Sequence, residues 1–186
     1  MTAARDRLIE AALALFAREG FHAVGIDRIV AEAGVAKQTL YHHFASKEDL
    51  MLAAIRRRDE TFRLWIARET RRLAPQGGAG QLLAIFDVVA GWIDTDEFRG
   101  CLFLKACAEY ADPDCALHRA VAEHQRLVTQ WLAALAGEAG LADPEELAGA
   151  IYLLAQGAIV LGAAQGSGAP ARAARRAAEQ LLRAGV

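Results

Sequence analysis

The sequence of 186 residues predicts an all-α protein of about nine helices. Apolar residues recur at intervals of three and four along most of the chain, which is the period of a helix buried on one face. No stretch shows the alternation of apolar and polar residues that a half-buried strand requires. Helix-start and helix-stop residues divide the chain, and its apolar fraction of 54% is enough to form a core.

The first helix is expected to run to about Arg18, with Thr2 as its cap and Gly20 beyond its end. One face of this helix is apolar, while charged residues occupy the other. The residues expected to be buried are Leu8, Ala12, Leu15 and Phe16.

Two short helices follow, joined by a tight turn at Gly34. Glycine is expected to stop the first of them because it adopts the left-handed conformation that a helix end needs. Its apolar residues share one face and comprise Ile26, Ile29, Val30 and Ala33. The second places Leu40 and Phe44, four residues apart, toward the same core. The stretch Gly25–Phe44 is therefore interpreted as a helix-turn-helix.

The outward face of the second short helix is polar, aromatic and basic, and it lacks acidic residues. It carries Lys37, Gln38, Thr39, Tyr41, His42 and His43. Such a face suits the major groove of DNA, where cations and hydroxyls contact phosphate and amide or hydroxyl groups read base edges. The alternative is an ordinary pair of surface helices whose polar residues face water.

A long helix is expected from Ser46 to about Leu73, because nothing interrupts it before Pro75. Ser46 and Asp49 form a pair resembling a capping box. Its length of roughly 40 Å would connect a DNA-binding head to a separate body. The basic run Arg56–Arg58 is interpreted as solvated surface rather than as a phosphate contact.

Five further helices complete the predicted fold. They are expected over Gln81–Ile93, over Phe98–Tyr110, from Asp112-Pro113 to about Ala139, from Asp143-Pro144 to about Gln165, and over Ala171–Ala184. The uncharged run Leu147–Ala171 is long enough to span a bilayer. Glycine and glutamine residues dilute it and Gly166–Pro170 interrupt it, so an interior or interface helix is predicted, with no membrane partner.

The stretch Gly34–Leu50, GVAKQTLYHHFASKEDL, closely resembles the recognition-helix signature of the TetR family of transcriptional regulators. Upstream, Leu15–Phe21 is similar to that family's first helix and its exit. The resemblance implies a helix-turn-helix DNA-binding domain at 1–46 and a ligand-binding and dimerisation domain at 47–186. It also implies a homodimer through the last two helices and a repressor that a small-molecule effector releases from a palindromic operator.

Contacts with double-stranded DNA follow from the resemblance and from side-chain chemistry. The resemblance assigns phosphate contacts to Tyr41, His43 and Lys47, while Lys37 suits phosphate or guanine and His42 completes the polar face. Glutamine pairs with adenine and threonine meets the thymine methyl, so Gln38 and Thr39 are the expected base readers. The family usually has Ser or Thr near Gly25 and Ser at Ala36, so the caps and phosphate contacts there are in doubt.

The body supplies aromatic surface and a few polar groups that would orient a small-molecule effector of unidentified structure. The candidate residues are Phe62, Trp65, Phe86, Phe103, Cys107, Tyr110, His124, Trp131, Tyr152 and Gln156. Each one taken alone is better explained as core. Cys101 lies near a helix start that favours a thiolate, so a redox sensor is one hypothesis and a small buried apolar residue is the other.

Composition excludes several classes of protein. The net charge is −2, but residues 1–72 hold 13 basic and 10 acidic residues, so the mildly basic end is the one that would face phosphate. No signal peptide is recognisable, which predicts a cytoplasmic protein. No catalytic, metal-binding or cofactor-binding motif is present, so no enzyme, metal or cofactor is expected. A helical enzyme and a helical interaction protein with degenerate DNA binding remain as alternatives.

Overall fold

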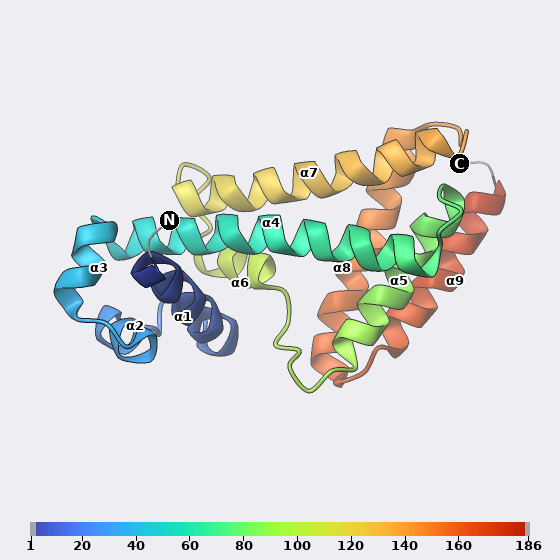
Figure 1. The fold of residues 1–186 in the computed structure, drawn as a ribbon. Helices are drawn as coiled ribbons and strands as arrows, with labels where there is room; N and C mark the ends of the chain where they lie inside the picture. The colour runs from blue at the N-terminus through green and yellow to red at the C-terminus, as the bar shows by residue number, and fades with distance from the viewer. Residues whose placement is uncertain (1–2, 185–186) are drawn as a thin grey trace. The chain divides into compact units, whose positions relative to one another are not determined.

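The computed structural model describes residues 3–184, and the regular structure in that range is entirely α-helical (Figure 1). Its helices are α1 (Ala3–Glu19), α2 (Ile26–Ala33), α3 (Lys37–His43), α4 (Lys47–Leu73), α5 (Ala79–Ile93), α6 (Leu102–Glu109), α7 (Ala116–Glu138), α8 (Pro144–Gln165) and α9 (Ala169–Ala184). The predicted all-α fold of nine helices is confirmed over this range. The expected cap Thr2 lies outside the described residues.

Two helices begin later than the sequence predicted. Helix α6 starts at Leu102 rather than at Phe98: residues 94–97 form a turn and residues 98–101 are irregular. Helix α7 starts at Ala116 rather than at Asp112-Pro113. The Asp112 carboxylate accepts a hydrogen bond from the Asp114 N–H (2.9 Å), which closes a local turn in competition with a helix start.

The chain divides into two compact units. Unit 1 combines the chain up to Thr61 with Cys101–His124, and unit 2 combines Phe62–Gly100 with the chain from Gln125 onward. Helices α4 and α7 therefore each contribute residues to both units. This division differs from a boundary at residue 46, and the assignment of functions to 1–46 and 47–186 stays a prediction.

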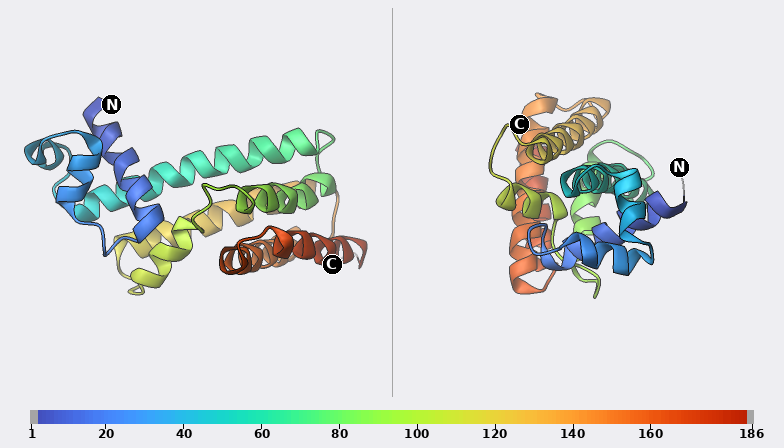
Figure 2. Two further views of the ribbon diagram at one scale, coloured as in Figure 1. Left: turned by 90° about the horizontal axis from the view of Figure 1, so that it is seen from below. Right: turned by 90° about the vertical axis from the view of Figure 1, so that its left-hand side faces the viewer.

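Unit 1 is built around the head formed by α1, α2 and α3, and the first part of α4 crosses α1 (Figure 2). Phe16 and Phe21 are fully buried and stack with ring centroids 4.6 Å apart. Burying each such ring stabilises the fold by about 1.5–3 kcal/mol. On the surface, Arg57 of α4 pairs with Asp6 (2.8 Å) and Glu10 (3.3 Å) of α1.

Unit 2 contains α5, α8 and α9, which pack on one another. The Asp94 carboxylate at the end of α5 accepts hydrogen bonds from the Gly168 N–H (2.6 Å) and from the Arg172 guanidinium (2.9 Å). These donors hold the pKa of Asp94 below its usual value, chiefly through Arg172. Aromatic rings of Phe62, Trp65, Trp92 and Phe98 form a second cluster in this unit.

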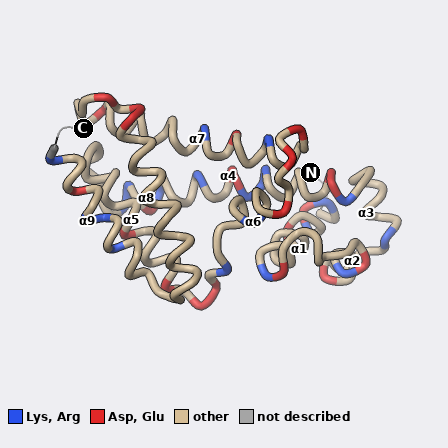
Figure 3. The backbone as a smooth tube through the Cα atoms, turned by 180° about the vertical axis from the view of Figure 1, so that it is seen from behind, with Lys and Arg blue, Asp and Glu red and all other residues tan. Residues whose placement is uncertain are grey.

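Helix α8 carries no charged side chain beyond its first turn, so most of its tube is tan in Figure 3. Its buried face includes Ile151 and Ile159, whereas its other face leaves Leu153 (74%), Val160 (53%) and Leu161 (53%) exposed. By length and composition alone, α8 could also cross a bilayer, but the core helix of a soluble protein can have the same length and composition. An exposed apolar side of this kind is typical of a protein–protein contact surface.

Candidate DNA-binding surface

The turn between α2 and α3 has the geometry predicted for a helix-turn-helix. Gly34 adopts the left-handed conformation with φ 62°, and its N–H donates a hydrogen bond to the carbonyl of Ala31 (3.2 Å). The N–H of the next residue, Val35, donates a hydrogen bond to the carbonyl of Val30 (3.1 Å). No heavy atom lies within 4 Å of a Cβ built at Gly34, so glycine is needed there for its backbone conformation rather than for space.

Apolar anchors determine which face of α3 is exposed. Leu40 is fully buried and Phe44 nearly so, both within the core of unit 1. The opposite side of α3 therefore faces outward. Of its predicted contact residues, the exposed ones are Lys37, Gln38, Tyr41 and His42, and the half-buried ones are Thr39 and His43. The expected polar face is thus assembled on one surface of α3.

One intramolecular ion pair lies on this face. The Lys37 Nζ is 2.7 Å from the carboxylate of Asp27, a residue in the first turn of α2. The hydrogen bond to Asp27 raises the pKa of Lys37 above its ordinary value. Sequence reasoning assigned Lys37 to DNA but missed Asp27, although its position in the first turn of the preceding helix was a usable signal. The pair holds the lysine and places a negative charge on the surface.

Lys47, predicted to hold phosphate, has an internal partner in the structure. Its Nζ donates a hydrogen bond to the carbonyl of Phe21 (2.7 Å), which links the start of α4 to the loop between α1 and α2. An ammonium has three donors, so one bond leaves two for a phosphate. The neighbouring Ser46 hydroxyl accepts from the Asp49 N–H (3.0 Å) and caps α4 as predicted.

The starts of α2 and α3 lack side-chain caps. Gly25 and Ala36 occupy the two N-cap positions in extended backbone conformations, and neither makes a side-chain cap hydrogen bond. At Gly25, no heavy atom lies within 4 Å of an added Cβ, so a hydroxyl residue would fit there. Both departures noted in the sequence therefore leave backbone N–H groups of these helix starts without a side-chain acceptor.

Arg5, on the first turn of α1, was missed by sequence reasoning as a neighbour of α3. Its guanidinium carbon lies 5.2 Å from the centroid of the Phe44 ring, a cation–π contact at the end of α3. Together with His43 and Arg56 it lines an open surface hollow of about 420 Å³. No local sequence signal links Arg5 to residue 44, because the contact depends on how α1 packs.

The candidate ligand residues are divided between the two units. Unit 1 holds Phe103, Cys107, Tyr110 and His124, whereas unit 2 holds Phe62, Trp65, Phe86, Trp131, Tyr152 and Gln156. In unit 1, the His124 ring is 3% exposed, stacks on Phe103 with centroids 3.5 Å apart, and places Nδ1 2.8 Å from the Asp59 carboxylate. That the ten residues form one ligand site stays a prediction.

The burial of the Cys101 thiol favours a structural role for this residue. Burial raises the pKa of its thiol, although backbone hydrogen bonds near the start of α6 act in the opposite direction. A raised pKa reduces the thiolate fraction and so disfavours the redox-sensor hypothesis. Among residues 3–184, no three or more His, Cys, Asp or Glu side chains are grouped to hold a metal ion.

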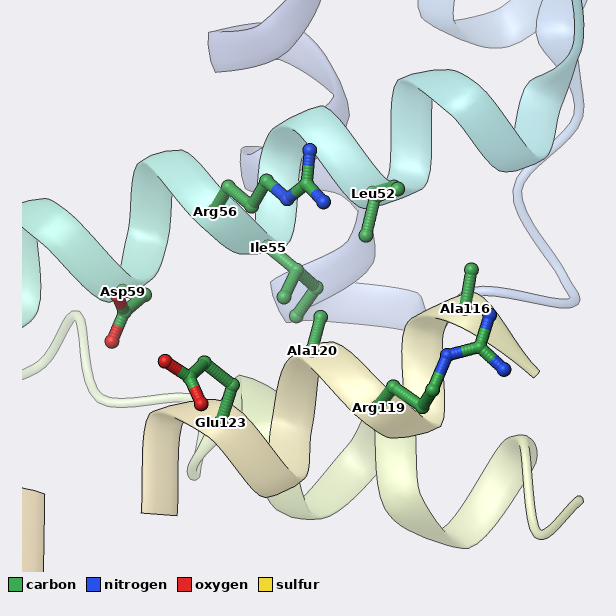
Figure 4. Close-up of a pocket in the computed structure, with 8 residues that line it drawn as sticks. All are labelled: Leu52, Ile55, Arg56, Asp59, Ala116, Arg119, Ala120 and Glu123. Carbon is green, nitrogen blue, oxygen red and sulfur yellow. The ribbon is translucent and has the colours of Figure 1, made fainter. Parts of the chain in front are cut away.

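A further hollow of about 240 Å³ lies in unit 1 between α4 and α7 (Figure 4). Its apolar part includes Leu52, Ile55 and Ala120, and Arg56, Asp59, Ala116, Arg119 and Glu123 complete its lining. None of the candidate ligand residues lines this hollow. Its volume is below the roughly 300–1,000 Å³ typical of small-molecule sites.

The three-helix head, the glycine turn and the exposed acid-free α3 define a helix-turn-helix DNA-binding protein. Residues 8–54 match the family model described as bacterial regulatory proteins, tetR family, and residues 78–178 match the tetracyclin repressor-like C-terminal domain. The second match covers more than half of the chain. The protein therefore belongs to the TetR family of DNA-binding transcriptional regulators.

One solved structure of a TetR-family regulator and two helix-turn-helix transcriptional regulators are similar to this chain. A TetR-family regulator from Streptomyces coelicolor is 35% identical, with a TM-score of 0.85 covering 97% of this chain and 94% of that one. The regulator YjdC of Escherichia coli is 22% identical over 96% of this chain and 93% of its own. The transcriptional activator FasR of Mycolicibacterium smegmatis is 47% identical over 28% of this chain, but that match spans only 24% of FasR.

Proposed function

We propose that the protein is a homodimeric repressor that binds a near-palindromic operator and leaves it when a small molecule binds the body. The proposal rests on the outward face of α3. Leu40 and Phe44 are buried in the core, so the polar side chains of α3 face outward. Gln38 and Thr39 would read base edges, and Tyr41, His43 and Lys47 would hold phosphates.

The proposed dimer joins α8 and α9 of two copies. Leu153, Val160 and Leu161 form an exposed apolar strip on α8, and such a strip is stabilised when a partner removes it from water. In a two-fold dimer the two α3 helices would enter successive major grooves about 34–36 Å apart, which is one turn of DNA. A covered strip also explains why a helix with no charge beyond its first turn need not lie in a membrane.

Effector release requires only that the ligand prefer the state that does not bind DNA. A 100-fold preference corresponds to about 2.7 kcal/mol of coupling. Helix α4 has residues in both units, and ligand-linked movement of this helix would change the position of the heads. The proposal places the protein in the cytoplasm and assigns it no enzymatic step.

The proposal is tested by footprinting the purified protein on DNA flanking its own gene, with and without a ligand library. Specific protection that weakens with salt, and that Tyr41→Ala abolishes, is the expected result, because phosphate contacts release counterions. Equal affinity for flanking and random DNA would refute the proposal and favour a helical interaction protein. Ligand turnover that persists in the Tyr41→Ala variant would instead favour a helical enzyme.

A further inference from the structure

One side chain of α6 holds the loop between α1 and α2, residues 20–25. The Glu109 carboxylate accepts hydrogen bonds from the backbone N–H of Phe21 (2.9 Å, to Oε1) and of His22 (2.7 Å, to Oε2). These donors lie just beyond the end of α1, whereas the acceptor is the last residue of α6. One carboxylate therefore holds two successive peptide groups. Both bonds are strong, because hydrogen bonds to an ionised acceptor are about twice as strong as those to a neutral one.

Two lysines complete this attachment, and we call Lys47, Lys105 and Glu109 the loop clasp. The Lys105 Nζ, one turn before Glu109 on α6, donates to the carbonyl of Ala17 in the last turn of α1. The Lys47 Nζ donates to the carbonyl of Phe21. Both the N–H and the carbonyl of Phe21 are therefore bound by charged side chains, from α6 and from α4.

Gly20 provides the space that the clasp needs. A Cβ at this position would lie 2.5 Å from Glu109 Oε1, much closer than non-bonded atoms approach, and the residue has φ +85°. Beside it, the His22 ring stacks on Tyr110 with centroids 4.7 Å apart, and its Nδ1 lies 3.2 Å from Glu109 Oε2. The loop is thus fitted closely around the carboxylate.

We propose that Glu109 is a positioning residue for operator binding. Through Phe21 and His22 it fixes the chain that leads into α2, and so it fixes the orientation in which α2 and α3 meet DNA. Helices of eight and seven residues without side-chain caps have little stability of their own, so their placement depends on such attachments. The inference rests on the proposed function, since operator affinity is the quantity that Glu109 controls.

Operator affinity of full-length variants on DNA flanking the protein's own gene tests the role of Glu109. Glu109→Ala should weaken specific binding by about tenfold, because two backbone donors lose a charged acceptor. Glu109→Gln, which keeps one acceptor oxygen, should weaken it less. Asp114→Asn is the matched control: it neutralises an exposed carboxylate of the same unit outside the clasp, and it should bind like wild type.

Hydrogen exchange distinguishes positioning from general loss of structure. In Glu109→Ala, the amides of Phe21 and His22 should exchange faster, while the Phe44 amide, which is bonded to the Leu40 carbonyl (2.8 Å), should keep its protection. If that variant does not fold, the same comparison on Glu109→Gln replaces it. Unchanged exchange of the loop amides in a folded variant would overturn the clasp.

A double-mutant cycle provides the second test. Gly20→Ala should weaken operator binding in the wild-type background, because its Cβ displaces the carboxylate. The same change should cost several-fold less in Glu109→Ala, where the obstacle is gone and only the left-handed backbone penalty remains. Additive effects would show that the glycine and the carboxylate do not act together, and would overturn the inference.

The two proposals fail in different ways. If wild type does not distinguish flanking from random DNA, the proposed function is wrong, and the positioning role falls with it. If wild type prefers its operator and folded Glu109→Ala binds it equally tightly, only the role of Glu109 is wrong.

Discussion

Replacing Ala36 by serine should stabilise the protein by supplying a missing cap to α3. Ala36 is the N-cap residue, with φ −73° and ψ 150°, and it forms no side-chain cap hydrogen bond. Those angles lie in the region that capping residues adopt, so serine requires no change in backbone. Its Oγ would accept from the N–H of Gln38, the second residue of the helix, because the Thr39 N–H already donates to the Ala36 carbonyl (2.9 Å).

The size of the effect follows from this geometry. Exchange between alanine and serine at an N-cap changes stability by about 1 kcal/mol, within a range of roughly 0.5–2 kcal/mol. Ala36 is exposed, so the hydroxyl is not buried and there is no desolvation cost to subtract. For a chain of this length, about 1 kcal/mol corresponds to a rise in Tm of about 2–4 °C.

Thermal unfolding followed by circular dichroism measures the change. The matched control is Ala31→Ser, which makes the same substitution at an exposed position inside α2. Serine in a helix interior lowers stability by about 0.5 kcal/mol, so the control should melt slightly below wild type. If Ala36→Ser melts at or below Ala31→Ser, the N-cap of α3 is not the weak point that the structure indicates.

Three further substitutions test other parts of the molecule. Asp27→Asn should free Lys37 for phosphate, tightening DNA binding and steepening the slope of log K against log salt by about one unit; an unchanged slope would contradict this. Gln38→Ala should cost about 1–3 kcal/mol at one operator position and leave random-DNA affinity unchanged in gel shifts. Asp94→Asn should lower Tm at pH 7. The pKa of Asp94 is depressed in the folded protein, so its ionised carboxylate stabilises the fold at any pH above its ordinary pKa of 3.8. That deficit should disappear as pH falls through the depressed pKa, and a pH-independent deficit would show that charge is not the cause.

Local signals in the sequence were sufficient for most of the head. Gly34 stops α2 and Ser46 caps α4 in the structure, because both effects depend on residues within one helical turn. The spacing of Leu40 and Phe44 likewise identified the buried side of α3, and hence the exposed side. These features follow from backbone conformation and helical periodicity, which a single sequence expresses directly.

Partners distant in sequence were not predictable in the same way. One error was local instead: Asp112-Pro113 has the composition of a helix start, but the Asp112 side chain accepts a hydrogen bond from the Asp114 N–H and forms a turn. Lys47 was assigned to phosphate with no indication that the Phe21 carbonyl would bind its ammonium. A side chain with several donors has many possible acceptors, and tertiary packing decides among them.

The missing caps and the loop clasp belong to the same physical problem. Hydrogen bonds from side chains to the first N–H groups of α2 and α3 would have stabilised these helices locally, but Gly25 and Ala36 provide none. Lys47 and Glu109, whose partners lie in the loop that precedes α2, therefore add to the order that the buried core provides. Since α6 carries Glu109, a change that moves α6 would act on the loop that leads into α2. Adding a cap at Ala36 should accordingly reduce the effect of Glu109→Ala on operator affinity.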